Sequence, residues 1–225
     1  MISIIVPTYN EAGNIKELVK QIGTVLKSMR YEVIVIDDDS PDGTYKIARS
    51  LPKVRAFCRK RKRGLSSAVI DGFSHAKGEH ILVMDADLSH PPKYLPKLID
   101  RLKDHDLVIG SRLVKGGSVQ EWPFHRKLLS FGARMISRPL TSVKDTMSGF
   151  FAFRREIIKD VKLNGLGYKI LLEVIVKGKA KKISEVPFTF VNRGVGESKI
   201  TGNVCFEYLQ QVSSLMFYKI KNLKH

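Results

Sequence analysis

The stretch ILVMDADLSH, residues 81–90, is an apolar run of strand length that ends in two carboxylates one residue apart. Side chains at i and i+2 of an extended segment point the same way, so Asp85 and Asp87 can face one point where the strand stops. Two adjacent anions repel unless a cation joins them, and Mg²⁺ and Mn²⁺ prefer oxygen ligands. A strand end followed by an ordinary turn explains an isolated pair of this kind equally well. The rest of the chain has to decide between the two interpretations.

Apolar runs alternate with helical patterns on both sides of this stretch. Strands are expected at 2–6, 31–36, 54–58, 81–84 and 106–110, and helices at 15–28, after residue 44, at 65–76 and from the prolines at 91–92 to about 102. Asn14 is expected to cap the first helix. Strands that are apolar on both faces and alternate with helices predict an α/β fold with a mostly parallel central sheet flanked by helices.

The second half of the chain is less regular. Helices are expected at 124–136, 168–176 and 204–220, a loop running into a strand at 145–153, and a strand broken by Pro187 at 183–191. No internal repeat or clear linker is visible.

Polar turns follow the predicted strands. They occupy residues 7–11, 37–43, 85–89 and 110–112. In open α/β sheets, ligands bind beyond the carboxyl ends of the strands. Several polar loops at one edge are stronger evidence for a site than any one of them.

The charge of the chain indicates an anionic partner. Its 225 residues carry a formal net charge of +17 with a pI near 9.9. Nucleic acid, an acidic membrane face and phosphorylated substrates all satisfy this charge. The two cysteines have no metal-like spacing, which favours free thiols. No leader sequence is expected at the N-terminus, and no apolar stretch approaches the roughly 20 residues needed to cross a bilayer.

Seven motifs in a fixed order carry a resemblance to a known family. They are PTYNE (7–11), DDDSPDGT (37–44), RKRKRGLSSA (59–68), MDADLSHPP (84–92), GSR (110–112), DTMSGFFAF (145–153) and RGVGESK (193–199). In this set the chain resembles the dolichol- or polyprenol-phosphate mannose synthases, inverting glycosyltransferases of family 2. The resemblance covers essentially the whole chain. It implies a GT-A nucleotide-diphospho-sugar transferase fold and transfer of mannose from GDP-mannose to dolichyl or polyprenyl phosphate.

The resemblance also implies a set of site residues. Asp85 and Asp87 match the metal-binding Asp-x-Asp, with Mg²⁺ or Mn²⁺ as the cofactor, and Asp87, Arg112, Arg193 and Lys199 match catalytic positions. The matching substrate-binding positions are Pro7, Tyr9, Glu11, Ile36, Asp38, Asp85, Ala86, Asp87, Arg112, Arg193 and Lys199. Ser89 stands where some relatives have a metal-binding glutamine, so a water is expected in place of a third protein ligand. Ser66 and Asp39 also depart from the pattern.

Elementary chemistry supports the same assignment. The departing nucleoside diphosphate gains negative charge, which a metal held by Asp85 and Asp87 neutralises as a Lewis acid. Arg112, Arg193 and Lys199 are suited to clamp phosphates. A phosphate-monoester acceptor has a second pKa of roughly 6 and is already a dianion, so no catalytic base is assigned.

Several features have plainer explanations. Asp37, Asp38 and Asp39 could form a turn that caps a helix, Asp42 is interpreted as structural, and His90 as a loop or capping residue. Seven of the eleven residues from 53 to 63 are basic. A solvated charge run and a phosphate or membrane contact explain that segment equally well.

The expected organisation is a GT-A catalytic domain over 1–202 and an amphipathic C-terminal helix over 203–225 that faces the core, a partner or a membrane. The chain is expected to be cytoplasmic and peripheral at the cytoplasmic face of an anionic membrane, with a membrane-anchoring partner protein as a further candidate. The loop at 114–124, with Trp122, is a candidate lipid contact.

Three rival functions remain at this point. The same reaction with UDP-glucose is the nearest, because sequence does not reveal the donor pocket. A nucleic-acid-binding module fits the charge, but no known nucleic-acid-binding pattern appears, so no nucleic-acid partner is expected. An inactive scaffold is disfavoured by the intact Asp85, Asp87, Arg193 and Lys199.

Overall fold

The computed structural model describes residues 1–60, 64–120, 124–167, 169–191 and 202–222. The helices are α1 (Ile15–Val25), α2 (Thr44–Arg49), α3 (Leu65–His75), α4 (Leu95–Arg101), α5 (Phe124–Ser137), α6 (Ile170–Lys177) and α7 (Gly202–Asn222), with 3₁₀ turns η1 (Pro92–Tyr94) and η2 (Arg155–Ile158). The strands are β1 (Ile2–Thr8), β2 (Tyr31–Asp37), β3 (Val54–Cys58), β4 (His80–Val83), β5 (Leu107–Ser111), β6 (Ser118–Val119), β7 (Phe151–Arg154), β8 (Ile183–Pro187) and β9 (Thr189–Phe190).

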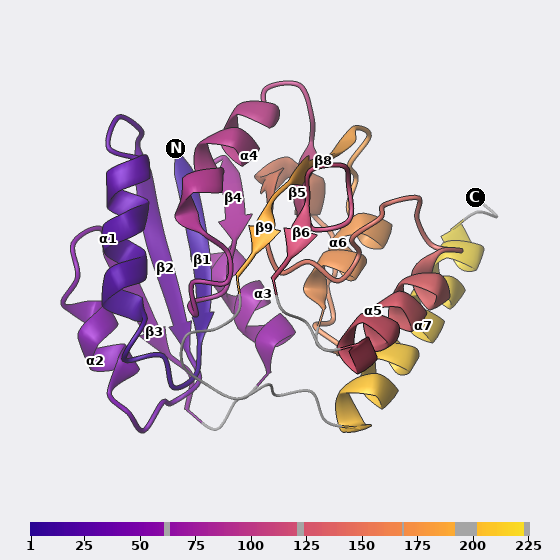
Figure 1. Ribbon diagram of the computed structural model, residues 1–225, viewed down its shortest axis with the longest axis horizontal. Coiled ribbons are helices and arrows are strands. Elements are labelled where there is room, and N and C mark those ends of the chain that lie inside the picture. The colour runs from indigo at the N-terminus through magenta and orange to yellow at the C-terminus, as the bar shows by residue number, and fades with distance from the viewer. Residues whose placement is uncertain (61–63, 121–123, 168, 192–201, 223–225) are drawn as a thin grey trace.

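Seven strands form the central sheet in the order β3-β2-β1-β4-β7-β5-β8 (Figure 1). All neighbouring pairs are parallel except those that β7 makes with β4 and β5. The prediction of a mostly parallel sheet is therefore confirmed. The antiparallel direction of β7 was not predicted, because a strand buried on both faces has the same apolar sequence in either direction.

The strand register brings the polar turns to one edge. Thr8 of β1 is opposite Asp37 of β2, and Ile5 is opposite Val83, the last residue of β4. The backbone N–H of Met84 then bonds to the carbonyl of Ile5 at 3.1 Å. The acidic turns after β2 and β4 thus flank the end of β1, as the predicted parallel sheet requires.

Two apolar layers cover the sheet. On one face, α1 contributes Ile15, Leu18 and Ile22, all fully buried, and α4 contributes Leu95 and Leu98. On the other face the core contains residues of α3 and α6. The helical spacing of the α1 residues is the reason that this segment forms an amphipathic helix. Asn14 occupies the N-cap position of α1 as predicted, but its side chain donates to the Glu11 carboxylate at 2.8 Å and makes no capping hydrogen bond.

A third apolar cluster joins α5, α6 and α7. Leu172 of α6 packs with Tyr208, Val212 and Leu215 of α7, and Ala133 of α5 packs against them. Figure 1 shows α5 and α7 side by side at the margin of the molecule, away from β1, β2 and β3. The predicted C-terminal helix is confirmed, and its inner face is part of this cluster. No helix among the described residues is long and apolar enough to span a bilayer.

The strand predicted at 183–191 is interrupted as expected. It divides into β8 and β9, and β9 pairs with β6 in a separate two-stranded parallel sheet. The β6 strand was not predicted, because two residues carry no periodicity. This small sheet matters for the site, since the N–H of Val191, just after β9, donates to the carbonyl of Ser89 at 3.3 Å.

Candidate active site

The turn after β4 holds both predicted carboxylates. The side chain of Asp85 is 25% exposed, whereas Asp87 is nearly buried. One carboxylate oxygen of Asp87 accepts hydrogen bonds from the Ser89 N–H at 3.1 Å and the Ser89 hydroxyl at 2.6 Å. Leu88 between them has φ 62°, a left-handed conformation that costs a residue of this kind roughly 1–2 kcal/mol. Ser89 therefore orients the carboxylate of Asp87, and the turn is held in a strained shape.

His90 organises this turn from within the core. Its Nδ1 accepts a hydrogen bond from the backbone N–H of Asp85 at 3.0 Å. The ring lies among Phe150, Phe188 and Phe190, at centroid distances of 5.2, 5.7 and 5.8 Å. Nδ1 is an acceptor and the site is apolar, so the imidazole is neutral with its proton on Nε2. His90 therefore does more than the loop or capping role expected of it.

The electrostatic surroundings of His90 show which charges gather here. Burial is the largest influence and lowers the pKa of His90. The carboxylates of Asp85 and Asp87 raise this pKa, whereas Arg112 and Lys169 lower it. Two predicted carboxylates, one predicted arginine and one lysine that was not predicted thus act on a single buried ring.

Arg112 is held by a carboxylate that sequence reasoning did not assign. Its Nε and one terminal nitrogen donate to the two oxygens of Asp145 at 2.8 and 2.7 Å, and its backbone N–H adds a bond of 2.9 Å. Burial tends to raise the pKa of Asp145, but the charge and hydrogen bonds of Arg112 outweigh it and hold this pKa below its ordinary value. The only available signal was the position of Asp145 at the start of the DTMSG motif.

The DTMSG loop also lies close to the side chain of Asp85. The Ser148 hydroxyl donates to the carbonyl of Gly110 at 2.7 Å, which ties the loop to the end of β5. A Cβ on Gly149 would lie 3.3 Å from both carboxylate oxygens of Asp85 and 3.2 Å from the His90 ring. Glycine at 149 therefore lets the backbone approach the carboxylate closely.

A narrow cavity opens beside Asp85. Its lining consists of Pro7, Leu65, Val69, Val83, Asp85, Ser148, Gly149, Phe151, Lys169 and Ile170. It joins a predicted nucleoside-binding position, Pro7, to a predicted metal-binding position, Asp85. Lys169 was missed because a single lysine near the start of the helix predicted at 168–176 belongs to no motif.

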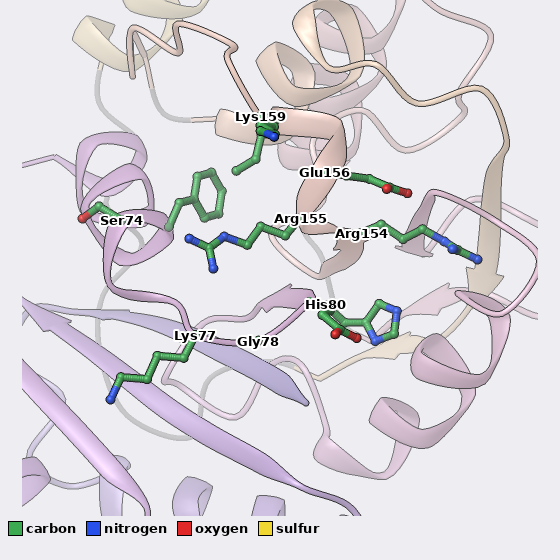
Figure 2. Close-up of a pocket in the computed structure, with 11 residues that line it drawn as sticks. Ser74, Lys77, Gly78, His80, Arg154, Arg155, Glu156 and Lys159 are labelled. Atoms are coloured by element: carbon green, nitrogen blue, oxygen red, sulfur yellow. The ribbon is translucent and has the colours of Figure 1, made fainter.

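A second, larger cavity of about 710 Å³ lies at the opposite edge of the sheet (Figure 2). It lies at the start of β4 and the end of β7, where His80 is opposite Arg154. None of the predicted site residues that the structure describes lines it. The guanidinium of Arg154 is occupied by the carbonyls of Leu102, Lys103 and His105. This cavity is therefore not the candidate active site.

The other predicted substrate-binding residues differ in their surroundings. Pro7 and Tyr9 lie at the end of β1, and the backbone N–H of Glu11 donates to the Thr44 hydroxyl at 2.8 Å. Ile36 is fully buried in the core layer that contains residues of α3. Its side chain therefore packs beneath the edge of the sheet where the polar turns meet. Ala86 is likewise buried in the core on the other face.

Asp38 belongs to a buried ion-pair network. Its Oδ1 pairs with Arg59 at 2.6 Å, and its Oδ2 accepts the N–H of Gly64 at 2.9 Å. Arg59 also donates to Ser67 and Asp71 of α3, at 3.0 and 3.1 Å. Arg59 therefore belongs neither to a solvated charge run nor to an exposed phosphate contact, the two interpretations of the basic segment. It ties Asp38 and Gly64 to the start of α3, and residues 61–63 of the basic segment lie outside the described residues.

The neighbouring aspartates are structural. Asp37 accepts hydrogen bonds from the Thr8 hydroxyl at 2.8 Å and the Ser40 N–H at 2.9 Å. The carboxylate of Asp42 accepts the N–H groups of Ala12 and Thr44, both at 3.0 Å. The structural interpretation of Asp42 is confirmed.

The donor set fits a divalent metal of the Mg²⁺ or Mn²⁺ type. Within the described ranges, no group of three or more His, Cys, Asp or Glu side chains is arranged as a metal site. Two carboxylates with substrate phosphates and water are the usual environment of Mg²⁺ in phosphate-handling enzymes. Asp85 and Asp87, one residue apart at a strand end, match that environment. Arg193, Lys199 and Trp122 lie outside the described residues.

Comparison with known proteins gives close relatives of this chain. The sequence model of glycosyl transferase family 2 matches residues 3–162. A dolichol-phosphate mannosyltransferase of Pyrococcus furiosus is 50% identical over 223 residues, covering 96% of this chain and 63% of that relative. The protein of the same name from Saccharomyces cerevisiae is 41% identical, covering 96% of this chain and 87% of that relative.

Solved structures support the fold. Glucosyl-3-phosphoglycerate synthase from Mycobacterium tuberculosis, bound to phosphoglyceric acid, aligns with a TM-score of 0.70 at 19% identity over 97% of this chain and 79% of that chain. Its complex with Mn²⁺, UDP-glucose and phosphoglyceric acid aligns with a TM-score of 0.69 at 18% identity, with the same coverage. At this identity the likeness concerns the fold alone, and the predicted α/β, GT-A-type architecture is confirmed.

Proposed function

The chain belongs to glycosyl transferase family 2, and we propose that it transfers mannose from GDP-mannose to dolichyl or polyprenyl phosphate, with inversion at the sugar carbon. The observation that carries this proposal is the Asp85/Asp87 pair at the end of β4, beside the Arg112–Asp145 ion pair, in a chain of this family. The relatives' names supply the sugar and the lipid phosphate. The chain spans 63% of the length of the Pyrococcus furiosus relative, so its own substrates require a direct test.

In the proposed reaction, Asp85 and Asp87 hold Mg²⁺ or Mn²⁺ against the donor diphosphate. When bound, the metal neutralises the charge that the departing GDP gains. Ser89 and His90 keep the turn in place, and Asp145 orients the guanidinium of Arg112. The acceptor phosphate, with a second pKa of roughly 6, attacks as a dianion, so positioning and charge stabilisation suffice without a general base.

The nucleoside is proposed to lie along the ends of β1 and β2. Pro7, Tyr9 and Glu11 lie at this edge. Ile36 supports it by packing in the core, and Asp38 supports it through its ion pair with Arg59. Arg193 and Lys199 are proposed to bind phosphates. Arg193 follows two residues after Val191, whose N–H bonds to Ser89, and this continuity supports its assignment to the site.

We propose that α5 and α7 face an anionic membrane surface at the cytoplasmic side, where the lipid acceptor is anchored. Their exposed apolar side chains are Phe131, Met135, Ile136, Phe206, Leu209, Phe217 and Ile220. Phe217 is 73% exposed, although it belongs to a helix whose opposite face is packed. The net charge of +17 favours such a surface, and each Lys or Arg near it adds about 1 kcal/mol before screening. A membrane-anchoring partner protein is the alternative occupant.

The test uses the purified chain with GDP-mannose, a polyprenyl phosphate and Mg²⁺ or Mn²⁺. We expect mannose to appear on the lipid phosphate, GDP to bind more tightly than UDP, and chelation to abolish transfer. Tighter binding of UDP with transfer from UDP-glucose would instead establish the rival donor. Vesicles with and without anionic lipid separate membrane binding from catalysis.

A further inference from the structure

We propose that Lys169 binds the phosphate of the lipid acceptor and is a further substrate-binding residue of this site. The proposal rests on the proposed function, which it extends by naming a residue for the acceptor. Three observations support the proposal. Lys169 shares a cavity with Asp85, contacts from neighbouring helices hold its backbone, and it lies on the side of the sheet away from the proposed nucleoside positions.

Lys169 and Asp85 line the same narrow cavity, together with Ser148 and Gly149. Among the described residues that line that cavity, Lys169 is the basic one. A phosphate that binds beside this cavity lies close to Lys169, whose positive charge can stabilise it. The ammonium group of lysine is a compact charge with three donors and is widely used to bind phosphate.

Arg112 is already engaged by Asp145 in this structure. Two of its side-chain nitrogens donate to the two oxygens of that carboxylate. The positive charge of Lys169 reaches the same region: burial, the largest influence, raises the pKa of Asp145, whereas Arg112 and Lys169 lower it. Lys169 thus adds cationic charge to a part of the site where the arginine is held by a carboxylate.

The backbone around Lys169 lies between α3 and α7. The side-chain amide of Gln211 in α7 donates to the carbonyl of Lys169 at 3.0 Å. A Cβ on Gly167, whose φ is +71°, would lie 3.1 Å from the side-chain oxygen of Gln211. A Cβ on Gly165 would lie 3.0 Å from Ile70 of α3. The backbone that presents Lys169 is therefore held by contacts from both sides.

A buried ion pair holds the same segment from the other side. The Glu173 carboxylate accepts the N–H groups of Asn164 and Gly165 at 2.7 and 3.1 Å. Lys177 pairs with Glu173 and also donates to the carbonyl of Lys162 at 3.2 Å. These bonds tie residues 162–165 to α6, the helix that Lys169 precedes.

The sheet order assigns Lys169 to the acceptor side. The proposed nucleoside positions lie on β1 and β2, and Asp85 follows β4, the next strand. Lys169 precedes α6, which packs on β7 and β5 in the other half of the sheet. It is also bonded to α7, whose outer face exposes Phe217 and Ile220. Lys169 thus lies between the proposed membrane-facing helix and the metal-binding carboxylates, where a lipid-anchored phosphate has to enter.

The experiment measures initial rates with the full chain while GDP-mannose and polyprenyl phosphate are varied separately. For Lys169→Met we expect kcat/KM for the lipid phosphate to fall about 10- to 100-fold, the effect of losing a charged hydrogen bond. The Kd for GDP with Mn²⁺ should stay within about 3-fold of the wild-type value. Lys169→Arg should recover part of the loss. The matched control is Lys179→Met, an exposed lysine just beyond the other end of α6.

Two outcomes would overturn the inference while leaving the proposed function intact. One is a Lys169→Met variant with unchanged acceptor kinetics in a preparation whose wild type transfers mannose. The other is a parallel loss of GDP affinity, which would assign Lys169 to the donor diphosphate. A wild type that binds GDP but transfers no mannose would overturn the proposed function itself, and this is measured before any variant is compared.

Discussion

The backbone N–H of Asp85 donates to Nδ1 of His90 across 3.0 Å, so a buried imidazole holds the backbone that carries the first carboxylate of the proposed metal site. His90 is 2% exposed and stacks on Phe150. The turn between Asp85 and His90 includes Leu88 in a left-handed conformation, which the surrounding contacts must maintain. The proposed metal site is thus shaped by a buried imidazole and the aromatic rings around it.

Replacement of His90 tests this arrangement. We expect His90→Ala to destabilise the fold by about 2–4 kcal/mol, since it removes a buried ring and leaves the Asp85 N–H without its acceptor. His90→Asn places an oxygen near the Nδ1 position and should retain more kcat than the alanine variant. Urea denaturation and initial rates measure the two effects. Equal kcat for both variants would contradict the role of the hydrogen bond.

Asp87 should be essential for turnover. Asp87→Asn keeps the shape of the side chain and an oxygen for Ser89, but it removes the charge that a divalent metal needs. We expect transfer to fall by at least about 1000-fold with little change in the melting temperature. Exposed Asp104 provides the control as Asp104→Asn. A metal-stimulated Asp87→Asn enzyme with near-normal rates would contradict the metal assignment.

The Arg112–Asp145 pair predicts a pH-dependent contribution to stability. Burial works to raise the pKa of Asp145, but Arg112 keeps it below its ordinary value. The stabilisation is therefore fully present above the unfolded-state pKa of about 3.9 and is lost as pH falls through the folded-state value. We expect Asp145→Asn to cost about 3 kcal/mol at neutral pH, because it leaves the arginine without its carboxylate. The difference in unfolding free energy from wild type should shrink only below about pH 4. A difference that already declines between pH 7 and 5 would contradict this assignment.

Arg59 should support nucleotide binding without touching the nucleotide. Arg59→Met leaves the buried carboxylate of Asp38 uncompensated, and we expect a loss of about 3–5 kcal/mol in unfolding free energy. Because the contacts that tie Asp38 and Gly64 to α3 are also lost, GDP affinity should fall more than affinity for the lipid phosphate. Denaturation and GDP titration test this. Exposed Lys60→Met, next in the chain, is the matched control.

The elements that were predicted correctly share one property, which is that their signal is local. The apolar runs at 2–6, 31–36 and 54–58 have the length of strands whatever they pair with, and they lie within β1, β2 and β3. The Asp85-Ala86-Asp87 turn likewise follows from the abrupt end of β4. The two-residue strand β6 and the direction of β7 depend on partners distant in sequence, so no local sequence pattern predicts either of them.

The sequence by itself determined a mostly parallel α/β sheet, the edge at which its polar turns meet, and the carboxylate pair, because periodicity and strand ends are local properties of the chain. The tertiary structure alone decided which charges face one another. It engaged Arg112 with Asp145, 33 residues away, turned Asp38 toward Arg59, buried the side chain of Ile36, and brought Lys169 to the cavity of Asp85. The physical reason is that an ion pair or a cavity depends on which strand and helix ends come together in space, and this depends on the packing of the whole sheet.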